Sequence, residues 1–175
     1  MIQVRVELTM PAIASVAQVL SDPNEIFAGA HEVICSDLAR QFHAGGIPSW
    51  KPLSEITVAE KRRSGYPRRT REGEENLDLI QNGNFAPSNV LMRTGGLYSS
   101  WTDPDDPDHI FDADAAGMDV GSSLEYAATH QYGRPGGGWR GSDIPARPLV
   151  ITDEALAAAA TAIEATLNTA AEAGS

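Results

Sequence analysis

The hydrophobic pattern of this chain begins with a strict alternation over residues 2–8, where the apolar positions are Ile2, Val4, Val6 and Leu8. A period of two is typical of a strand with one buried face. Two further short runs, at 110–113 and 118–121, flank turn-forming residues at 114–117. We therefore predict one strand near the start of the chain and a β-hairpin later in it.

Other stretches carry apolar residues at helical spacing. A short helix is expected within residues 9–20. A longer one is predicted over residues 23–43, because Asp22–Glu25 resembles a capping box with proline in the first turn. Gly45–Gly46 would end that helix. The last predicted helix covers residues 153–170 and has one thin apolar face rich in alanine.

These elements predict a fold of the α+β class. A length of 175 residues suits one domain with a real core, so the whole chain, 1–175, is interpreted as a single domain. We expect a small antiparallel or mixed sheet made by the first strand and the hairpin. The helices at 23–43 and 153–170 would cover it, the second capped by Thr152 or Asp153, and long loops would connect the elements.

Charge narrows the classes of partner. The formal net charge is −11 and the isoelectric point is near 4.6. This disfavours general nucleic-acid binding and anionic membranes, because both depend on clustered cations. Cys35 is the sole cysteine, which excludes a disulfide within the chain and a cysteine-rich zinc site, and we expect it to be a buried core residue. We expect a soluble, unprocessed protein with no membrane span.

The cations are unevenly distributed. Residues 61–71 hold six of the thirteen cations and no acid, and a long polar loop is predicted over about 62–90. A solvated loop is the simplest interpretation, and an acidic neighbouring copy or a nucleic acid are the alternatives. The candidate subunit or partner contacts are Arg62, Arg63, Arg68, Arg69, Arg71 and, in the later glycine-rich loop, Trp139.

Motifs for catalysis or cofactor binding are weak. The histidines are accompanied by no Gly-x-Ser-x-Gly elbow, so a hydrolase is disfavoured. The acidic turn at 103–114 lacks the glycine and terminal glutamate of an EF-hand loop. Gly136–Gly138 is not followed by the Lys-Ser/Thr of a phosphate-binding loop. We therefore predict no catalytic residue, no cofactor and no metal site.

The stretch from Tyr126 to Val150 is the most informative architectural pattern. It predicts a short helix that ends at Gly133, followed by a glycine-rich loop and two prolines that direct the chain into the last helix. His130 is interpreted as a helix-end residue that makes hydrogen bonds near Gly133. Arg147, between the two prolines, is the expected polar tie. Earlier in the chain, Trp50 lies between prolines and is expected to plug the edge of the core.

Six motifs occur in a fixed order along the chain. They are Phe42…Gly46-x-Pro48-x-Trp50-x-Pro52-Leu53-Ser54, Thr57…Lys61, Leu91…Thr94-Gly95-x-Leu97…Ser100, Val120-Gly121-Ser122, Tyr126-Ala127…His130-Gln131…Gly133 and Ile144-Pro145-Ala146-Arg147-Pro148-Leu149. In this order they resemble the phage virion morphogenesis, or tail completion, family that includes the Mu-type G-like protein. The resemblance covers roughly residues 25–170. The charged loop at 62–89 and the Asp-Pro turn near residue 105 depart from it, and these segments would carry partner specificity.

The resemblance implies a structural virion protein that acts in tail completion and head–tail joining. It would form a homo-oligomeric ring, expected to be a hexamer, at the neck or tail end, after assembly in the host cytoplasm. Its neighbours would be head-connector and tail-terminator or tail-tube proteins, and DNA would pass through the channel without specific binding. The structural motif residues are Trp50, Pro52, Thr94, Gly95, Leu97, Gly121, Tyr126, His130, Gly133, Pro145, Arg147 and Pro148.

Two other functions stay open. The first is a capsid-assembly or scaffolding-type adaptor that is absent from the mature particle. The second, from a different class, is a phosphodiester- or peptide-cleaving enzyme, which the absence of a catalytic motif disfavours.

Overall fold

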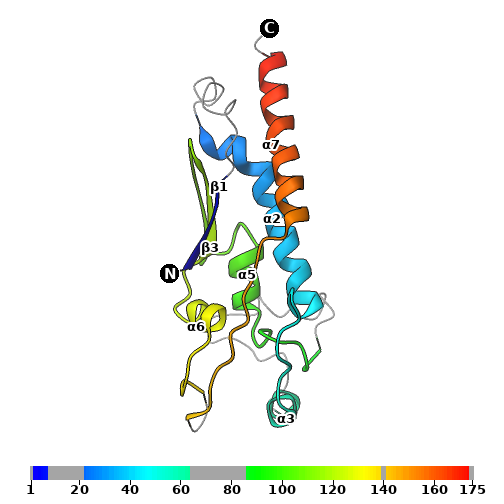
Figure 1. The fold of residues 1–175 in the computed structure, drawn as a ribbon, viewed down its shortest axis with the longest axis vertical. Coiled ribbons are helices and arrows are strands. Elements are labelled where there is room, and N and C mark those ends of the chain that lie inside the picture. The colour runs from blue at the N-terminus through cyan, green and yellow to red at the C-terminus, as the bar shows by residue number, and fades with distance from the viewer. Residues whose placement is uncertain (1, 8–21, 64–85, 139–140, 174–175) are drawn as a thin grey trace.

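The computed structural model describes residues 2–7, 22–63, 86–138 and 141–173, and it confirms the predicted α+β class (Figure 1). The predicted helix within 9–20, most of the predicted loop at 62–90, and the candidate contacts Arg68, Arg69, Arg71 and Trp139 lie outside the described residues. The elements are β1 (Ile2–Glu7), α2 (Pro23–Ala44), α3 (Glu55–Arg63), α5 (Gly96–Thr102), β2 (His109–Asp114), β3 (Gly117–Ser122), α6 (Ala127–Tyr132) and α7 (Asp153–Ala173).

The sheet is antiparallel, with β3 between β1 and β2. Val120 of β3 is paired with Val4 on one side and Phe111 on the other. The predicted hairpin is confirmed. Its turn is fixed by Asp114, whose carboxylate accepts the backbone N–H groups of Ala116 and Gly117 at 2.8 and 3.0 Å.

The ends of α2 follow the sequence signals. The Asp22 carboxylate accepts the backbone N–H of Asn24 at 2.9 Å, which satisfies one of the free donors of the first turn. Gly45 adopts the left-handed conformation, with φ of 78°, and ends the helix.

The elements form layers (Figure 1). Helices α2 and α5 lie against the sheet, and α7 runs antiparallel to α2 along the side of α2 that faces away from it. Close packing of α2 and α7 depends on small residues: a Cβ atom at Gly29 would lie 3.4 Å from the Cβ of Ala162. Within the described part of the chain, none of the helices is both long and apolar enough to cross a membrane.

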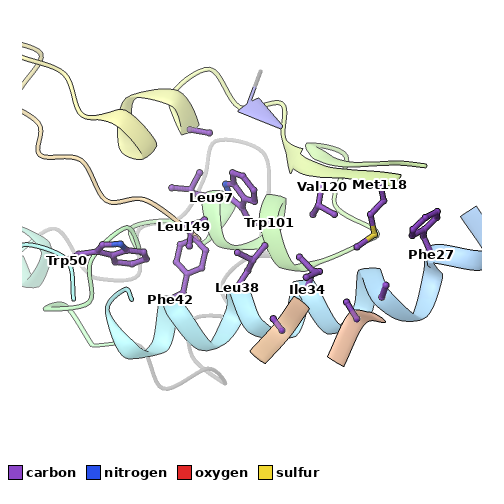
Figure 2. Close-up of a cluster of buried hydrophobic side chains, with 14 of the residues drawn as sticks. Phe27, Ile34, Leu38, Phe42, Trp50, Leu97, Trp101, Met118, Val120 and Leu149 are labelled. Atoms are coloured by element: carbon purple, nitrogen blue, oxygen red, sulfur yellow. The ribbon is translucent and has the colours of Figure 1, made fainter. Parts of the chain in front are cut away.

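The core lies between α2, α5 and β3 (Figure 2). Ile34 and Phe42 of α2 are fully buried, as are Met118 and Val120 of β3, and Trp101 of α5 fills the space between them. Each such side chain contributes about 1.5–3 kcal/mol through the apolar surface it buries. This packing fixes the positions of α2 and α5, on which the other loops rest.

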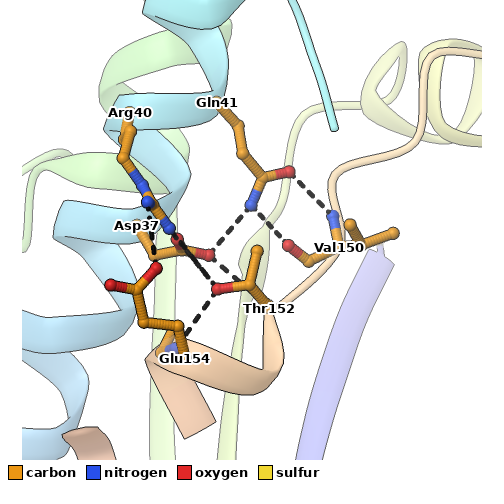
Figure 3. Close-up of polar contacts among 7 residues, drawn as sticks. Asp37, Arg40, Gln41, Val150, Thr152 and Glu154 are labelled. Carbon is orange, nitrogen blue, oxygen red and sulfur yellow. Dashed lines mark hydrogen bonds and ion pairs between the residues drawn. The ribbon is translucent and has the colours of Figure 1, made fainter. Parts of the chain in front are cut away.

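Asp37, buried on α2, ties that helix to the start of α7 (Figure 3). Its carboxylate accepts hydrogen bonds from the Thr152 hydroxyl at 3.1 Å and from the Gln41 amide at 3.0 Å, and it pairs with Arg40. Burial alone would raise the pKa of Asp37, but the hydrogen bonds outweigh it, so the pKa lies below its ordinary value. The Thr152 hydroxyl also accepts the N–H of Ala155, which confirms Thr152 as the cap of α7.

Residues 144–152, here called the return segment, run in extended form from the loop after α6 to α7 (Figure 1). Two glutamine side chains form hydrogen bonds with its backbone N–H and carbonyl groups, as a neighbouring strand would do. Gln131 of α6 accepts the N–H of Leu149 and donates to its carbonyl, both at 3.0 Å. Gln41 of α2 makes the same pair of bonds with Val150, as Figure 3 shows. Buried backbone groups are costly without partners, so these amides substitute for a sheet.

Two more contacts hold the return segment. The indole N–H of Trp50 donates to the carbonyl of Pro148 at 2.9 Å, and Trp50 is buried, as predicted. The backbone N–H of Arg147 donates to the carbonyl of His130 at 2.7 Å. Arg147, which was predicted as a polar tie, is therefore joined to the end of α6 through its backbone N–H.

Gly133 is the position where this arrangement tolerates least change. Its φ and ψ are 74° and 170°, a region that is essentially restricted to glycine. A Cβ atom there would lie 2.8 Å from the nitrogen of Ala146 and 2.9 Å from the carbonyl oxygen of Ile144. Both of these are backbone atoms of the return segment, which cannot move away without breaking its hydrogen bonds.

We therefore expect Gly133→Ala to lower the free energy of unfolding by about 3 kcal/mol, the sum of backbone strain and overpacking. Gly45→Ala is the matched control: φ is 78° there, but nothing lies within 4 Å of the added Cβ, so only about 1 kcal/mol should be lost. Urea unfolding of both variants measures the difference. Equal losses would show that the return segment does not pack closely against Gly133.

Candidate functional site

The six motifs noted in the sequence meet in space. Lys61 of the second motif donates to the carbonyl of Met92, inside the third. Ser100, at the end of the third, accepts the hydroxyl of Ser122, the last residue of the fourth, at 2.8 Å. The first and sixth motifs are joined by Trp50 and Pro148, as described above, and the fifth and sixth by the Gln131 amide. Segments that are far apart in the chain thus form one continuous unit.

A pocket of about 420 Å³ opens in this unit. Five of the six motifs contribute to its wall, together with Arg93. The lining residues are Leu53, Lys61, Leu91, Met92, Arg93, Thr94, Gly95, Leu97, Tyr126, His130 and Arg147. None of these residues is acidic, although the whole chain has a net charge of −11.

Lys61 is the most unusual group in the wall. It is 9% exposed, and its ammonium donates to the carbonyls of Asn89 and Met92 at 2.8 and 2.7 Å. Burial, followed by the positive charges of Arg93 and Arg147, lowers the pKa of Lys61 to about 8. Both of these acceptors are backbone carbonyls of the segment that leads into α5, so Lys61 joins α3 to that segment.

Arg147 and His130 add two polar atoms that lack partners. Arg147 is 8% exposed, and its Nε has no hydrogen-bond partner within the described residues. The Nδ1 atom of His130 is buried and also has no hydrogen-bond partner among the described residues. Burial lowers the pKa of both side chains, and the charge of Arg147 lowers that of His130 further. The hydrogen bond predicted for His130 is thus made by its carbonyl, and its ring nitrogen is left available.

The rim of the pocket is built by the start of α5 and by α6. Gly95 precedes α5 with φ of 88°, which brings the backbone of the third motif close to Tyr126. A Cβ atom at Gly96 would lie 3.4 Å from the Tyr126 hydroxyl. Tyr126 is 44% exposed, and its ring meets that of His130 edge to face at 6.1 Å between centroids. Tyr126 therefore forms an accessible edge of the pocket, as does the exposed Arg93.

The other predicted site residues have different positions. Gly121 lies within β3, paired with Ile110, and Pro52 is exposed. Pro145 is partly buried in the return segment. Arg62 and Arg63 are exposed at the end of α3, where positive charge suits the carbonyl end of a helix. Lys61, one residue earlier, is not part of that solvated surface, and neither its role nor that of Arg93 was predicted from the sequence.

A second hollow, of about 840 Å³, lies between α3 and the loop at Ser142. Its lining includes Ile56, which is 81% exposed, and the hydroxyls of Ser54 and Thr57, which contact each other at 2.9 Å. The two hydroxyls hydrogen-bond to each other, and Ile56 faces solvent. The smaller pocket is the better candidate because it concentrates buried cations and unpartnered donors.

The chemistry of the smaller pocket suits an anion. Cations in a partly dry environment attract a carboxylate or phosphate far more strongly than exposed ones do. Among the described residues, its lining provides no carboxylate to serve as a general base for hydrolysis. Comparisons of the chain with protein-family models, curated proteins and solved structures give no match.

The pKa of Lys61 gives a test of the pocket. The unfolded lysine has a pKa of 10.5 and the folded one about 8, so between these pH values the unfolded chain binds a proton that the folded chain has released. Stability rises with pH wherever the unfolded state binds more protons. The free energy of unfolding of the wild type, measured relative to Lys61→Met, should therefore increase across this interval.

Lys51→Met is the control, because Lys51 is exposed on the neighbouring loop and should give no such slope. Urea unfolding at several pH values measures the difference. A wild-type advantage that stays constant with pH would mean that Lys61 is solvated like an ordinary lysine.

Proposed function

We propose that this chain is a structural virion protein of a tailed phage that acts in tail completion and head–tail joining. It works as a homo-oligomeric ring, expected to be a hexamer, around the DNA channel at the neck or tail end, and it is assembled in the host cytoplasm. It has no catalytic role. The supporting observation is that five of the six motifs that carry the family resemblance line a single pocket, and that the remaining motif, Val120-Gly121-Ser122, is hydrogen-bonded to one of those five.

This arrangement is compatible with the resemblance. Segments that supply the core of one domain contact one another, and residues of these motifs are part of that core. Here the contacts are specific hydrogen bonds, such as those from Trp50 to Pro148 and from Lys61 to Met92. The motifs therefore describe one built structure, which is what a shared architecture requires.

The pocket supplies a docking site for the proposed ring. A carboxylate from a neighbouring subunit, or from an adjoining connector or tail protein, would enter it and pair with Arg147, whose Nε has no partner among the described residues. Such a pair would be desolvated, and that makes it specific in register and orientation. Other copies of this acidic chain carry many candidate carboxylates, including the exposed Asp105.

The acidic character of the rest of the chain supports the same function. DNA must move through a head–tail joint without adhering to its wall, and negative surfaces repel phosphates. Arg62 and Arg63, exposed on α3, would contact an acidic neighbour in this arrangement. We therefore propose that Arg62 and Arg63 contact other proteins and do not bind DNA.

The two alternatives make different demands. A scaffolding-type adaptor would use the same docking pocket but leave the finished particle. A hydrolase would need His130 to act on a bound substrate, and the described part of the pocket wall offers it neither a carboxylate partner nor a nucleophile paired with it. Tail completion is favoured because it explains both the pocket and the segregated charge.

Purified particles of the phage that carries this gene test the proposal. We expect mass spectrometry to find the protein in mature particles, in an amount equal to about one ring per particle. Deleting the gene should leave filled heads and separate tails. A protein present in precursor heads but missing from mature particles would refute tail completion and support the adaptor.

Arg147→Met tests the pocket in the same system. Replacing a buried, uncompensated cation by an apolar side chain of similar length should leave the thermal midpoint unchanged or raise it. It should weaken each subunit contact by about 2–5 kcal/mol, so heads and tails would remain unjoined. Arg134→Met, an exposed arginine outside the pocket, should join normally. Normal joining of heads and tails with Arg147→Met would show that the pocket is not the docking site.

A further inference from the structure

A second group of chemically active side chains lies far from the pocket, between α2 and the start of β2. His31 and Cys35 are four residues apart and thus on one face of α2, and both are 5% exposed. The Nε2 atom of His31 lies 2.8 Å from the Nε2 atom of His109. Those two nitrogens and the Cys35 sulfur all lie within 4.8 Å of one another.

The surroundings orient both imidazoles. The Nδ1 atom of His109 lies 3.1 Å from the carbonyl oxygen of Ser100, so Nδ1 carries the proton and Nε2 presents its lone pair to His31. The ring of His31 is stacked on that of Phe111, with 4.1 Å between centroids and an angle of 8°. A histidine that donates its outer N–H to a backbone carbonyl is the usual support for a metal ligand.

We propose that His31, Cys35 and His109 form a binding site for a zinc ion, with the two Nε2 atoms and the Cys35 thiolate as ligands and water in the fourth position. Imidazole and thiolate are the ligands that zinc prefers, in a tetrahedral arrangement. The sequence-based expectation of no metal site considered a cysteine-rich zinc site and an EF-hand calcium loop, and neither of these covers a site made by two histidines and one cysteine.

The two imidazoles require little change. Two nitrogens bound to one tetrahedral zinc at about 2.05 Å each are about 3.3 Å apart, so the imidazoles would separate by roughly half an ångström. His31 would move its proton to Nδ1, and Cys35 would release one proton to solvent as the sulfur–zinc bond forms. The histidines thus keep their protons, and each bound zinc releases one proton in total.

Charge around the cluster favours a cation. Asp103 and Glu32 act electrostatically on Cys35. These two carboxylates would stabilise a dication bound beside it.

The site would have a structural role that is independent of the docking pocket. His31 and Cys35 belong to α2, while His109 begins β2, so one ion would join the central helix to the edge strand of the sheet. Because zinc would bind only the folded arrangement, it should raise the thermal midpoint of the whole chain. Loss of this site would leave head–tail docking chemistry intact.

Zinc and cobalt binding to the full chain tests the proposal. After zinc loading and dialysis, the wild type should retain about one zinc per chain. The cobalt-loaded protein should show a sulfur-to-cobalt charge-transfer band and the intense visible bands of a tetrahedral ion. Cys35→Ser should lose the charge-transfer band, and both Cys35→Ser and His109→Gln should bind zinc more than about 100-fold more weakly.

The control is His43→Gln, an exposed histidine of the same helix that should bind as the wild type does. Circular dichroism checks that each variant is folded, and the apoprotein of the wild type provides the reference for the zinc-dependent rise in thermal midpoint. Retention of well under one zinc per chain would overturn the proposal. So would a Cys35→Ser variant with unchanged zinc affinity, which would indicate adventitious binding to surface acids.

Discussion

The rest of the structure depends on how the return segment, residues 144–152, satisfies its backbone without a neighbouring strand. Gln131 and Gln41 each provide one amide that pairs with both the N–H and the carbonyl of a residue in this segment. Because the two glutamines come from α6 and α2, they also fix those helices relative to each other. The segment then places Arg147 in the pocket and delivers the chain to Thr152, where Asp37 anchors the start of α7.

The return segment positions Arg147 in the pocket. The burial of this charged side chain lowers the stability of the isolated chain. Arg147 is buried, and its Nε has no hydrogen-bond partner among the described residues, an arrangement that costs free energy in the isolated chain. The surrounding hydrogen bonds are strong enough to hold it. A free-energy cost of this kind is expected where a protein holds polar side chains in position for a partner. The proposed docking of a neighbouring carboxylate would recover that cost on assembly, which links the subunit contact to the stability of the ring.

Local signals made much of the fold predictable. The strand alternation, the cap at Asp22, the glycines after α2 and the turn at Asp114 each act within a few residues, so the α+β class and the main elements could be derived. The site was less predictable, because its groups act over distance. Lys61 meets carbonyls 28 and 31 residues later, and His31 meets His109 across 78 residues. A glutamine that pairs with a backbone has no pattern in sequence, so Gln41 and Gln131 could not be recognised.

Amide hydrogen exchange of the return segment tests the central claim most directly. The N–H groups of Arg147, Leu149 and Val150 belong to no helix or sheet, yet each donates to a defined acceptor at 2.7 to 3.2 Å. We expect these three amides to be protected from exchange about as strongly as those of the β2–β3 hairpin. The Leu149 amide should lose this protection in Gln131→Ala. Exchange of all three in the wild type at the rate of an unstructured peptide would contradict the central claim.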